Sequence, residues 1–165
     1  MKAISDVRLL ELTQQLATLL IQHKRRLVTA ESCTGGWVAK ACTDLAGSSS
    51  WFEGGVVSYS NDLKIALLGV SDHTLRRCGA VSEQVVREMA NGALKQLGGD
   101  ISVAISGIAG PEGGTDSKPV GTICFAWADK FGIESKTYLF EGDRELIRLQ
   151  SVFTALQGII KKLEP

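Results

Sequence analysis

The run TAESCTGGW, residues 29–37, places a carboxylate, two hydroxyl types, a thiol and a pair of glycines directly behind the apolar residues Leu27 and Val28. Such a change predicts a turn between a buried strand and a following helix. In an α/β protein this position also suits an active site, because the helix presents free N–H groups there. By itself, the run is compatible either with a plain turn or with an active site built on a turn.

Outward from this run, helical and extended patterns alternate along the chain. Apolar spacing predicts helices over residues 6–22 and 35–45, from Asn61, after Ser82 and from Asp143. Strands are expected at 27–30, within GGVVSYS (54–60), and at 101–105, 121–128 and 136–140. The pattern predicts a three-layer α/β/α fold with a mixed, mostly parallel sheet, in a single domain over residues 1–165.

Composition and charge restrict the classes of function. The chain has 165 residues and is 44% hydrophobic, which suits one domain with one core. Its 18 Lys and Arg balance 18 Asp and Glu, so we expect no nucleic-acid partner and no membrane surface. No apolar run is long enough to span a bilayer, and the amphipathic, acid-containing N-terminal segment is unlike a secretory signal. We therefore expect a cytoplasmic protein.

Metal, disulfide and common nucleotide chemistries are disfavoured by the motifs. The cysteines lack CxxC spacing, and both histidines stand apart from them; the cysteines are Cys33, Cys42, Cys78 and Cys124. The sequence contains neither GxxxxGK[ST] nor GxGxxG, which argues against ATP hydrolysis and dinucleotide redox chemistry. We expect no metal and no cofactor.

Three polar segments follow the ends of predicted strands. They are AESCTGG (30–36), YSND (59–62) and SGIAGPEGG (106–114). If these strands run parallel, the three segments converge on one edge of the sheet, where ligands bind in such folds. AGSSSW (46–51) lies between a helix end and a strand start, so we expect it at the opposite edge. This placement makes Ser48 a less favoured nucleophile.

The glycine-rich stretch 106–122 is a candidate binding loop. Its five glycines and two prolines exclude regular structure, and successive glycine N–H groups can form an anion-binding nest. A plain surface loop fits the composition equally well, but long loops in compact domains are usually functional. The candidate ligand-binding residues here are Ser106, Gly107, Gly110, Gly113, Gly114 and Thr115.

A nucleophile near the first turn needs a base. Ser32, Cys33 and Thr34 all precede a helix N-terminus, where backbone amides can form an oxyanion hole. Neither histidine suits the role of base, because His23 is expected to end the first helix and His73 to lie in a loop. The remaining candidate is Lys64, whose pKa burial can lower.

Other polar residues near these turns have a plain structural interpretation beside the functional one. Glu31 and Thr34 are suited to cap the following helix, and Tyr59 to pack in a strand. Alternatively Tyr59, with Asn61, relays a proton or orients substrate. Arg144 and Arg148 share one face at the start of the last helix, where they face water or bind a phosphate. Spacing alone indicates an anion-binding α/β domain and, less firmly, a hydrolase.

An ordered set of motifs resembles the CinA C-terminal domain family, whose stand-alone members are nicotinamide mononucleotide deamidases. The motifs are TAESCTGGWVAKACTDLAGSSSWFEGGVVSYSNDLK (29–64), GAVSE (79–83), ISGIAGPEGG (105–114), KPVGT (118–122) and GDR (142–144). The resemblance extends from about residue 8 to 162 and shows no departure from these motifs. The chain is similar to the stand-alone enzyme rather than to the longer CinA proteins, which carry an additional N-terminal domain.

The resemblance implies hydrolysis of the carboxamide of nicotinamide mononucleotide in pyridine nucleotide salvage, by a Ser/Lys dyad without metal. It places the nucleophile at Ser32 and the base at Lys64, so that amides around Thr34, Gly35 and Gly36 stabilise the oxyanion. The implied partner is a small-molecule nucleotide, and the chain length is compatible with a homo-oligomer.

For the rest of the substrate we expect the 5′-phosphate near the GPEGG loop with Thr115 and near Arg144, and the pyridinium charge near Glu31. Three rival interpretations stay open. Cys33 is the nucleophile in one. Ser48 is the nucleophile in another, reaching the site across a homodimer interface or by a loop excursion. In the third, the domain binds nucleotides or partners without catalysis.

Overall fold

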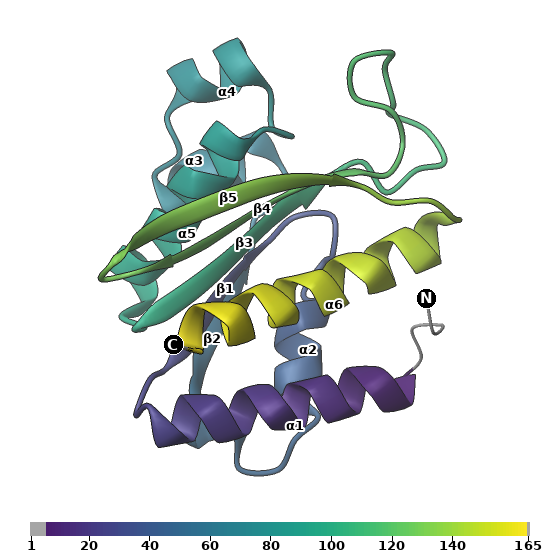
Figure 1. Ribbon diagram of the computed structural model, residues 1–165. Coiled ribbons are helices and arrows are strands. Elements are labelled where there is room, and N and C mark those ends of the chain that lie inside the picture. The colour runs from purple at the N-terminus through teal and green to yellow at the C-terminus, as the bar shows by residue number, and fades with distance from the viewer. Residues whose placement is uncertain (1–5, 165) are drawn as a thin grey trace.

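A five-stranded mixed sheet forms the middle layer of the computed structural model, which describes residues 6–164 (Figure 1). Its strand order is β2-β1-β3-β4-β5. The strands are β1 (Leu27–Glu31), β2 (Phe52–Val57), β3 (Ile101–Gly107), β4 (Thr122–Asp129) and β5 (Gly132–Leu139). β1 pairs in parallel with β2 and β3, while β4 is antiparallel to both β3 and β5. All strands except β4 therefore point the same way, which confirms the predicted mixed, mostly parallel sheet.

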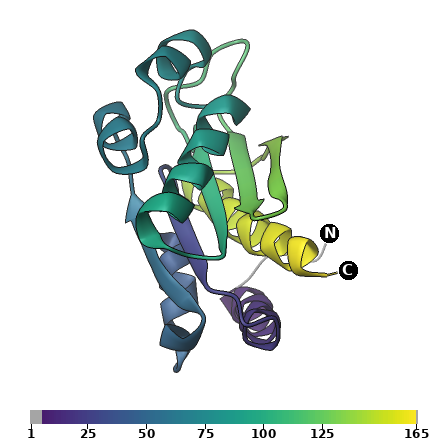
Figure 2. The same ribbon diagram turned by 90° about the vertical axis from the view of Figure 1, so that its left-hand side faces the viewer.

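Helices cover both faces of the sheet (Figures 1 and 2). One face carries α1 (Asp6–Gln22), α2 (Trp37–Thr43) and α6 (Arg144–Leu163). The other carries α5 (Glu83–Leu97), against which α3 (Asn61–Leu68) and α4 (Asp72–Cys78) pack. The helices begin where the sequence supplies capping side chains, since Ser60, Ser82 and Asp143 each accept a bond from an amide in the first turn. The three predicted layers are confirmed.

Side-chain alternation along β4 shows how the two halves of the core differ. Ile123, Phe125 and Trp127 belong to the cluster shared with α1, α2 and α6. The intervening residues Cys124, Ala126 and Ala128 belong to the cluster shared with α5. Because successive side chains of a strand point to opposite faces, β4 presents large residues to one helical layer and small residues to the other.

Some boundaries differ from the predicted ones. Residues 72–78, predicted as loop around His73, form α4, which Ser71 caps and whose Leu75 is buried. A helix of seven residues makes only about two turns, too few for its apolar spacing to be recognised in the sequence. β5 begins at Gly132 rather than at residue 136, because its hairpin with β4 pairs Gly132 with Asp129 directly.

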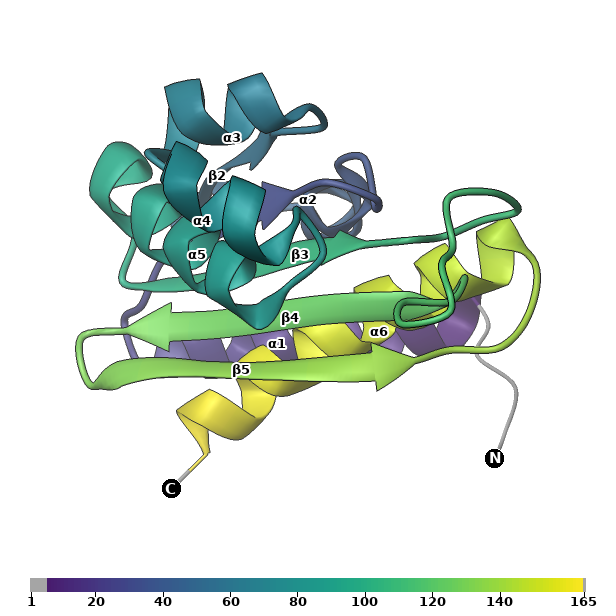
Figure 3. The same cartoon turned by 90° about the horizontal axis from the view of Figure 1, so that it is seen from above.

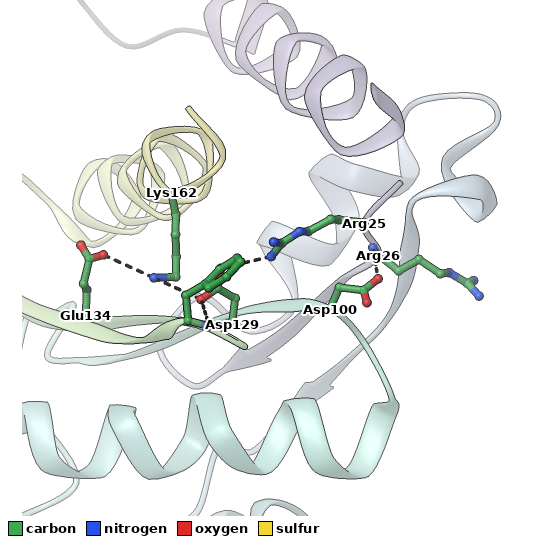
Figure 4. A network of polar contacts seen from close by, with 7 residues as sticks. Arg25, Arg26, Asp100, Asp129, Glu134 and Lys162 are labelled. Atoms are coloured by element: carbon green, nitrogen blue, oxygen red, sulfur yellow. Dashed lines mark hydrogen bonds and ion pairs between the residues drawn. The ribbon is translucent and has the colours of Figure 1, made fainter. Parts of the chain in front are cut away.

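A charged network joins the elements at the amino ends of β1 and β3 (Figure 4). The side chain of Asp129, at the end of β4, is 3% exposed; its carboxylate lies 3.1 Å from Arg25 Nη1 and 3.5 Å from Lys162 Nζ of α6. Nearby, the Arg26 amide donates to Asp100 Oδ2 at 2.8 Å, which ties β1 to the connection before β3. These contacts fix the edge of the sheet that lies opposite the polar loops.

Candidate active site

Three polar loops meet at the carboxyl ends of β1, β2 and β3, as the parallel topology predicts. Between them lies a cavity of about 220 Å³. Its lining comprises Ser32, Cys33, Tyr59, Lys64, Ala80, Val81, Ser106, Gly107, Ala109 and Arg144. Viewed from above, the loop between β3 and β4 and the start of α6 lie at the same end of the sheet (Figure 3). Residues from five separate segments thus share one small space.

Lys64 and Ser32 are in direct contact inside this cavity. Lys64 Nζ lies 3.0 Å from Ser32 Oγ, 2.7 Å from the Ser58 carbonyl oxygen and 3.2 Å from that of Tyr59. The Lys64 side chain enters from the first turn of α3 and is only 1% exposed. Ser32 follows β1 directly, and its amide donates to the Ile105 carbonyl of β3 at 3.0 Å. The hydroxyl and the amine therefore reach one edge of the sheet from segments that follow different strands.

The surroundings of Lys64 favour its neutral form. Burial lowers the pKa of its ammonium below the ordinary value of 10.5. Among residues 6–164, no carboxylate lies within ion-pair distance of its Nζ. A neutral amine has two N–H donors and one lone pair, which matches two carbonyl acceptors and one hydroxyl donor. Lys64 is placed to donate to Ser58 and Tyr59 and to accept the Ser32 proton.

Glu31 does not face the cavity. It is 1% exposed, and its carboxylate accepts bonds from Thr34 Oγ1 at 2.7 Å and from the amides of Gly36, Val38 and Ala39 at 2.9–3.1 Å. It thus satisfies the free amides at the start of α2, where a negative charge is also favoured. The expected contact of Glu31 with the pyridinium charge is wrong, because the carboxylate is fully used inside the fold.

The amides of the turn after β1 are used differently from the prediction. The Gly35 amide donates to the Ser32 carbonyl at 3.0 Å, and the Gly36 amide to Glu31 Oε2 at 3.0 Å. These two amides are therefore not free for an oxyanion. The amides of Cys33 and Thr34 donate to no other residue in the described part of the chain. Cys33 lines the small cavity, whereas Thr34 is buried and lines only the larger one.

Arg148 braces the same turn from α6. Its Nε donates to the Cys33 carbonyl at 3.0 Å and its Nη2 to the Thr34 carbonyl at 2.8 Å. Its guanidinium also lies 5.2 Å from the centre of the Trp37 ring. The two alternatives predicted for Arg148 were water and a phosphate. Tertiary packing instead turns its guanidinium toward backbone carbonyls more than a hundred residues away.

The two alternative nucleophiles differ from Ser32 in their surroundings. Cys33 is 7% exposed, and burial raises the pKa of its thiol to about 12, so the reactive thiolate is scarce. Ser48 lies in the short 3₁₀ segment Ser48–Ser50 that precedes β2. This segment adjoins the amino end of β1, where the Trp51 carbonyl accepts the Leu27 amide at 2.8 Å. Ser48 thus occupies the edge of the sheet opposite Ser32, as the sequence predicted.

Tyr59 and Arg144 stand at the mouth of the cavity. Tyr59 is 61% exposed, and its hydroxyl lies 3.4 Å from Arg144 Nη2. Arg144 Nη1 donates to the Gly110 carbonyl at 2.6 Å. Arg144 also lines a larger neighbouring cavity of about 860 Å³ between α1, α2 and α6. One guanidinium therefore stands between the two spaces.

The remaining predicted residues divide into two groups. Ser106 and Gly107 line the small cavity, and Ser106 Oγ donates to the Ala80 carbonyl at 2.8 Å. The other group lines neither cavity. Its members are Asn61, Gly113, Gly114 and Thr115. The sequence reasoning missed Ala80 and Val81, which line the cavity. Their signal was the GAVSE motif, to which no role was assigned.

Membrane-spanning helices and metal-binding clusters are both absent from residues 6–164. None of the helices in this range combines the length and apolar character needed to cross a membrane. Within the same range, no group of three or more His, Cys, Asp or Glu side chains is arranged to hold a metal ion.

Comparison with known proteins places this geometry in a family. The nicotinamide-nucleotide amidohydrolase PncC of Shigella flexneri is 52% identical over 94% of this chain and 95% of its own length. The protein of the same name from Escherichia coli strain K12 is 51% identical over the same shares. A crystal structure of a CinA superfamily protein from Klebsiella pneumoniae 700603 superposes with a TM-score of 0.91 at 44% identity, covering 94% of this chain and 97% of that one. The family model described as CinA C-terminal domain matches residues 9–163, and the chain belongs to this family.

Proposed function

We propose that this chain is a nicotinamide-nucleotide amidohydrolase that converts nicotinamide mononucleotide and water to nicotinate mononucleotide and ammonia. The observation that carries the proposal is the 3.0 Å contact between Lys64 Nζ and Ser32 Oγ in a buried site. A binding module has no use for a desolvated lysine on a serine hydroxyl, whereas amide hydrolysis needs such a base. The names of the relatives from Shigella flexneri and Escherichia coli, at 52% and 51% identity, support the same activity.

In the first step, Ser32 Oγ attacks the carboxamide carbon while Lys64 takes the hydroxyl proton. The C–O bond forms, the carbonyl π bond breaks, and the charge moves to the carbonyl oxygen. When the tetrahedral intermediate collapses, the C–N bond breaks and the Lys64 ammonium gives its proton to the departing ammonia. A water molecule then attacks the acyl-enzyme with the same base, which releases the nicotinate and restores the Ser32 hydroxyl.

In this proposal the amides of Cys33 and Thr34 donate hydrogen bonds to the oxyanion. Both lie immediately after the nucleophile and lack other acceptors among the described residues. Arg148 fixes the peptide between them by binding the Cys33 carbonyl. Donors that are already oriented stabilise the developing charge without reorganisation during the reaction.

The nucleotide end of the substrate is assigned to Arg144. This guanidinium stands at the mouth of the cavity next to the Tyr59 hydroxyl and borders the larger space. A guanidinium binds phosphate oxygens with two parallel N–H donors. A cytoplasmic site of action and a single catalytic domain are part of this proposal.

The proposal is tested by measuring ammonia release from nicotinamide mononucleotide, with chromatographic identification of the second product. Wild type, Cys33→Ala and Ser48→Ala are expected to form nicotinate mononucleotide, and Ser32→Ala is expected to fall to background. Lys64→Ala should lose about 10²–10⁴-fold, as is typical of a missing general base, while still binding the nucleotide.

Other outcomes identify the rival interpretations. Loss of activity in Ser48→Ala with survival of Ser32→Ala moves the nucleophile to the opposite edge. An inactive wild type that binds the nucleotide supports a binding module. Release of free nicotinamide indicates cleavage of the glycosidic bond instead. Loss of activity when a metal chelator is added to the enzyme contradicts the metal-free mechanism.

A further inference from the structure

One wall of the small cavity is a turn, residues 78–82, that connects α4 to α5. Ala80 and Val81 of this turn line the same space as Ser32 and Lys64. No catalytic role falls to either apolar residue. Their position nevertheless decides how much room a ring carrying the reactive carboxamide has beside the nucleophile.

Lys118 holds this turn from outside. Its Nζ donates to the Cys78 carbonyl at 2.8 Å and to the Val81 carbonyl at 2.7 Å. It forms no ion pair with a carboxylate among the described residues. The side chain is half-buried. A strongly hydrated ammonium has thus exchanged water for two backbone carbonyls, and such charge-assisted bonds are stronger than neutral ones.

The carbonyls between those two are also bound by side chains. Ser82 Oγ donates to the Gly79 carbonyl at 2.8 Å, and Ser106 Oγ of β3 donates to the Ala80 carbonyl at 2.8 Å. Four consecutive carbonyls, those of residues 78–81, therefore accept bonds from side chains rather than from a repeating backbone pattern. The shape of the turn depends on these donors, two of which come from β3 and from the loop that follows it.

The loop that follows β3 is built to present Lys118. Within it, the Thr115 amide donates to the Lys118 carbonyl at 2.9 Å, and the Lys118 amide returns a bond to the Thr115 carbonyl at 3.2 Å. A Cβ on Gly114 would come within 2.8 Å of the Val120 amide nitrogen. The glycine at this position therefore permits the loop to fold back on itself, which accounts for part of its composition without any anion.

We propose that Lys118 is a positioning residue that holds the Ala80 and Val81 wall at the distance required by the nicotinamide ring of the substrate. The inference rests on the proposed function for the identity of that ring. The glycine-rich loop then acts on substrate fit through the 78–82 turn. Ser106 contributes to the same task from β3, through its bond to Ala80.

The test compares Lys118→Met with Lys118→Arg, and with Lys95→Met as a control for loss of an exposed lysine. Steady-state kinetics with nicotinamide mononucleotide are measured together with hydrogen exchange of the amides of residues 78–86. Lys118→Met should raise KM about tenfold, the order expected when bonds from a charged donor are lost, with a smaller change in kcat. Lys118→Arg should restore most of the affinity, and exchange in the turn should accelerate only in Lys118→Met.

A folded Lys118→Met with wild-type KM overturns the proposal, even if its Tm is lower, because a merely structural bond would act on stability alone. If Lys118→Met does not fold, Ser106→Ala removes the bond to Ala80 together with a hydroxyl that lines the cavity. It should therefore both raise KM and accelerate hydrogen exchange in the turn, and an unchanged value of either overturns the proposal. If the wild type itself does not hydrolyse the nucleotide, the proposed function fails, and unchanged hydrogen exchange in the turn then overturns the positioning role separately.

Discussion

Lys64 Nζ lies 3.0 Å from Ser32 Oγ, although the two residues follow different strands. Parallel pairing of β1 and β2, with Glu31 opposite Val57, brings the ends of these strands together. Ser60 caps α3 so that Lys64 falls in its first turn and points back to the sheet edge. The proposed dyad therefore depends on one strand register and one helix cap.

The rate of hydrolysis should rise with pH through the ionisation of Lys64. Burial lowers the pKa of this ammonium, and the base form is the neutral amine, so activity is absent well below that pKa and reaches a plateau above it. The inflection in kcat/KM should lie below 10.5. A pH profile of kcat/KM checks this expectation.

Lys64→Arg serves as the matched variant for that profile, because arginine keeps the positive charge but does not deprotonate in proteins. It should lose activity at every pH. A Lys64→Arg enzyme that keeps the wild-type profile would assign the ionisation to another group.

Replacing Arg148 should lower kcat more than it changes KM. Arg148→Met removes the donors to the Cys33 and Thr34 carbonyls and frees the turn that holds the proposed oxyanion amides. A loss of about 10–10²-fold in kcat is expected, the order caused by small misplacements of catalytic groups. Steady-state kinetics provide the measurement, with exposed Arg77→Met as the control. Arg148→Lys should recover little, because an ammonium lacks the planar fork that spans two carbonyls.

Asp129 should stabilise the fold in its ionised form. Burial by itself would raise the pKa of this carboxyl, but the Phe131 amide, Lys162 and Arg25 hold it below its ordinary value of 3.8. Its contribution is present above that ordinary value and is lost as pH falls through the lower native pKa. Asp129→Asn should therefore lower the free energy of unfolding at neutral pH by about 1–3 kcal/mol and weaken its dependence on acid.

Urea unfolding of Asp129→Asn between neutral and acidic pH provides the measurement. Asp72→Asn, which removes an exposed ion pair with Arg76, should change stability by well under about 1 kcal/mol. Equal effects of the two substitutions would contradict the role assigned to the network in Figure 4.

Gly158→Ala should destabilise the protein, although alanine is the better helix former. A Cβ at position 158 of α6 would collide with the indole of Trp127, which is 7% exposed and donates to the Ala155 carbonyl at 2.9 Å. Alanine normally gains about 0.5–1 kcal/mol over glycine inside a helix. Here we expect a net loss of about 1–3 kcal/mol from overpacking. Thermal unfolding measures the sign, and the exposed neighbour Gln157→Ala should be nearly neutral.

The sequence predicted the layers because their signals are local. Helical spacing in residues 6–22 and 83–97 and the apolar run at 101–105 each lie within one element. The convergence of the polar loops also followed, since parallel strands place their carboxyl ends together. α4 and the first residues of β5 escaped prediction because a short helix and an edge strand gain their stability from packing and pairing.

Side-chain direction, by contrast, was decided by tertiary structure. Sequence reasoning left Glu31 between cap and substrate contact, and only the path of α2 turned its carboxylate onto the amides there. Arg148 was expected either to face water or to bind a phosphate, yet α6 crosses the turn after β1 so that its guanidinium binds two carbonyls. The motifs indicated Ser32 and Lys64. Hydrogen bonds between distant residues, however, leave no periodic pattern in a sequence. For that reason only the packed fold determined the separation of these two residues, their burial and the donors around them.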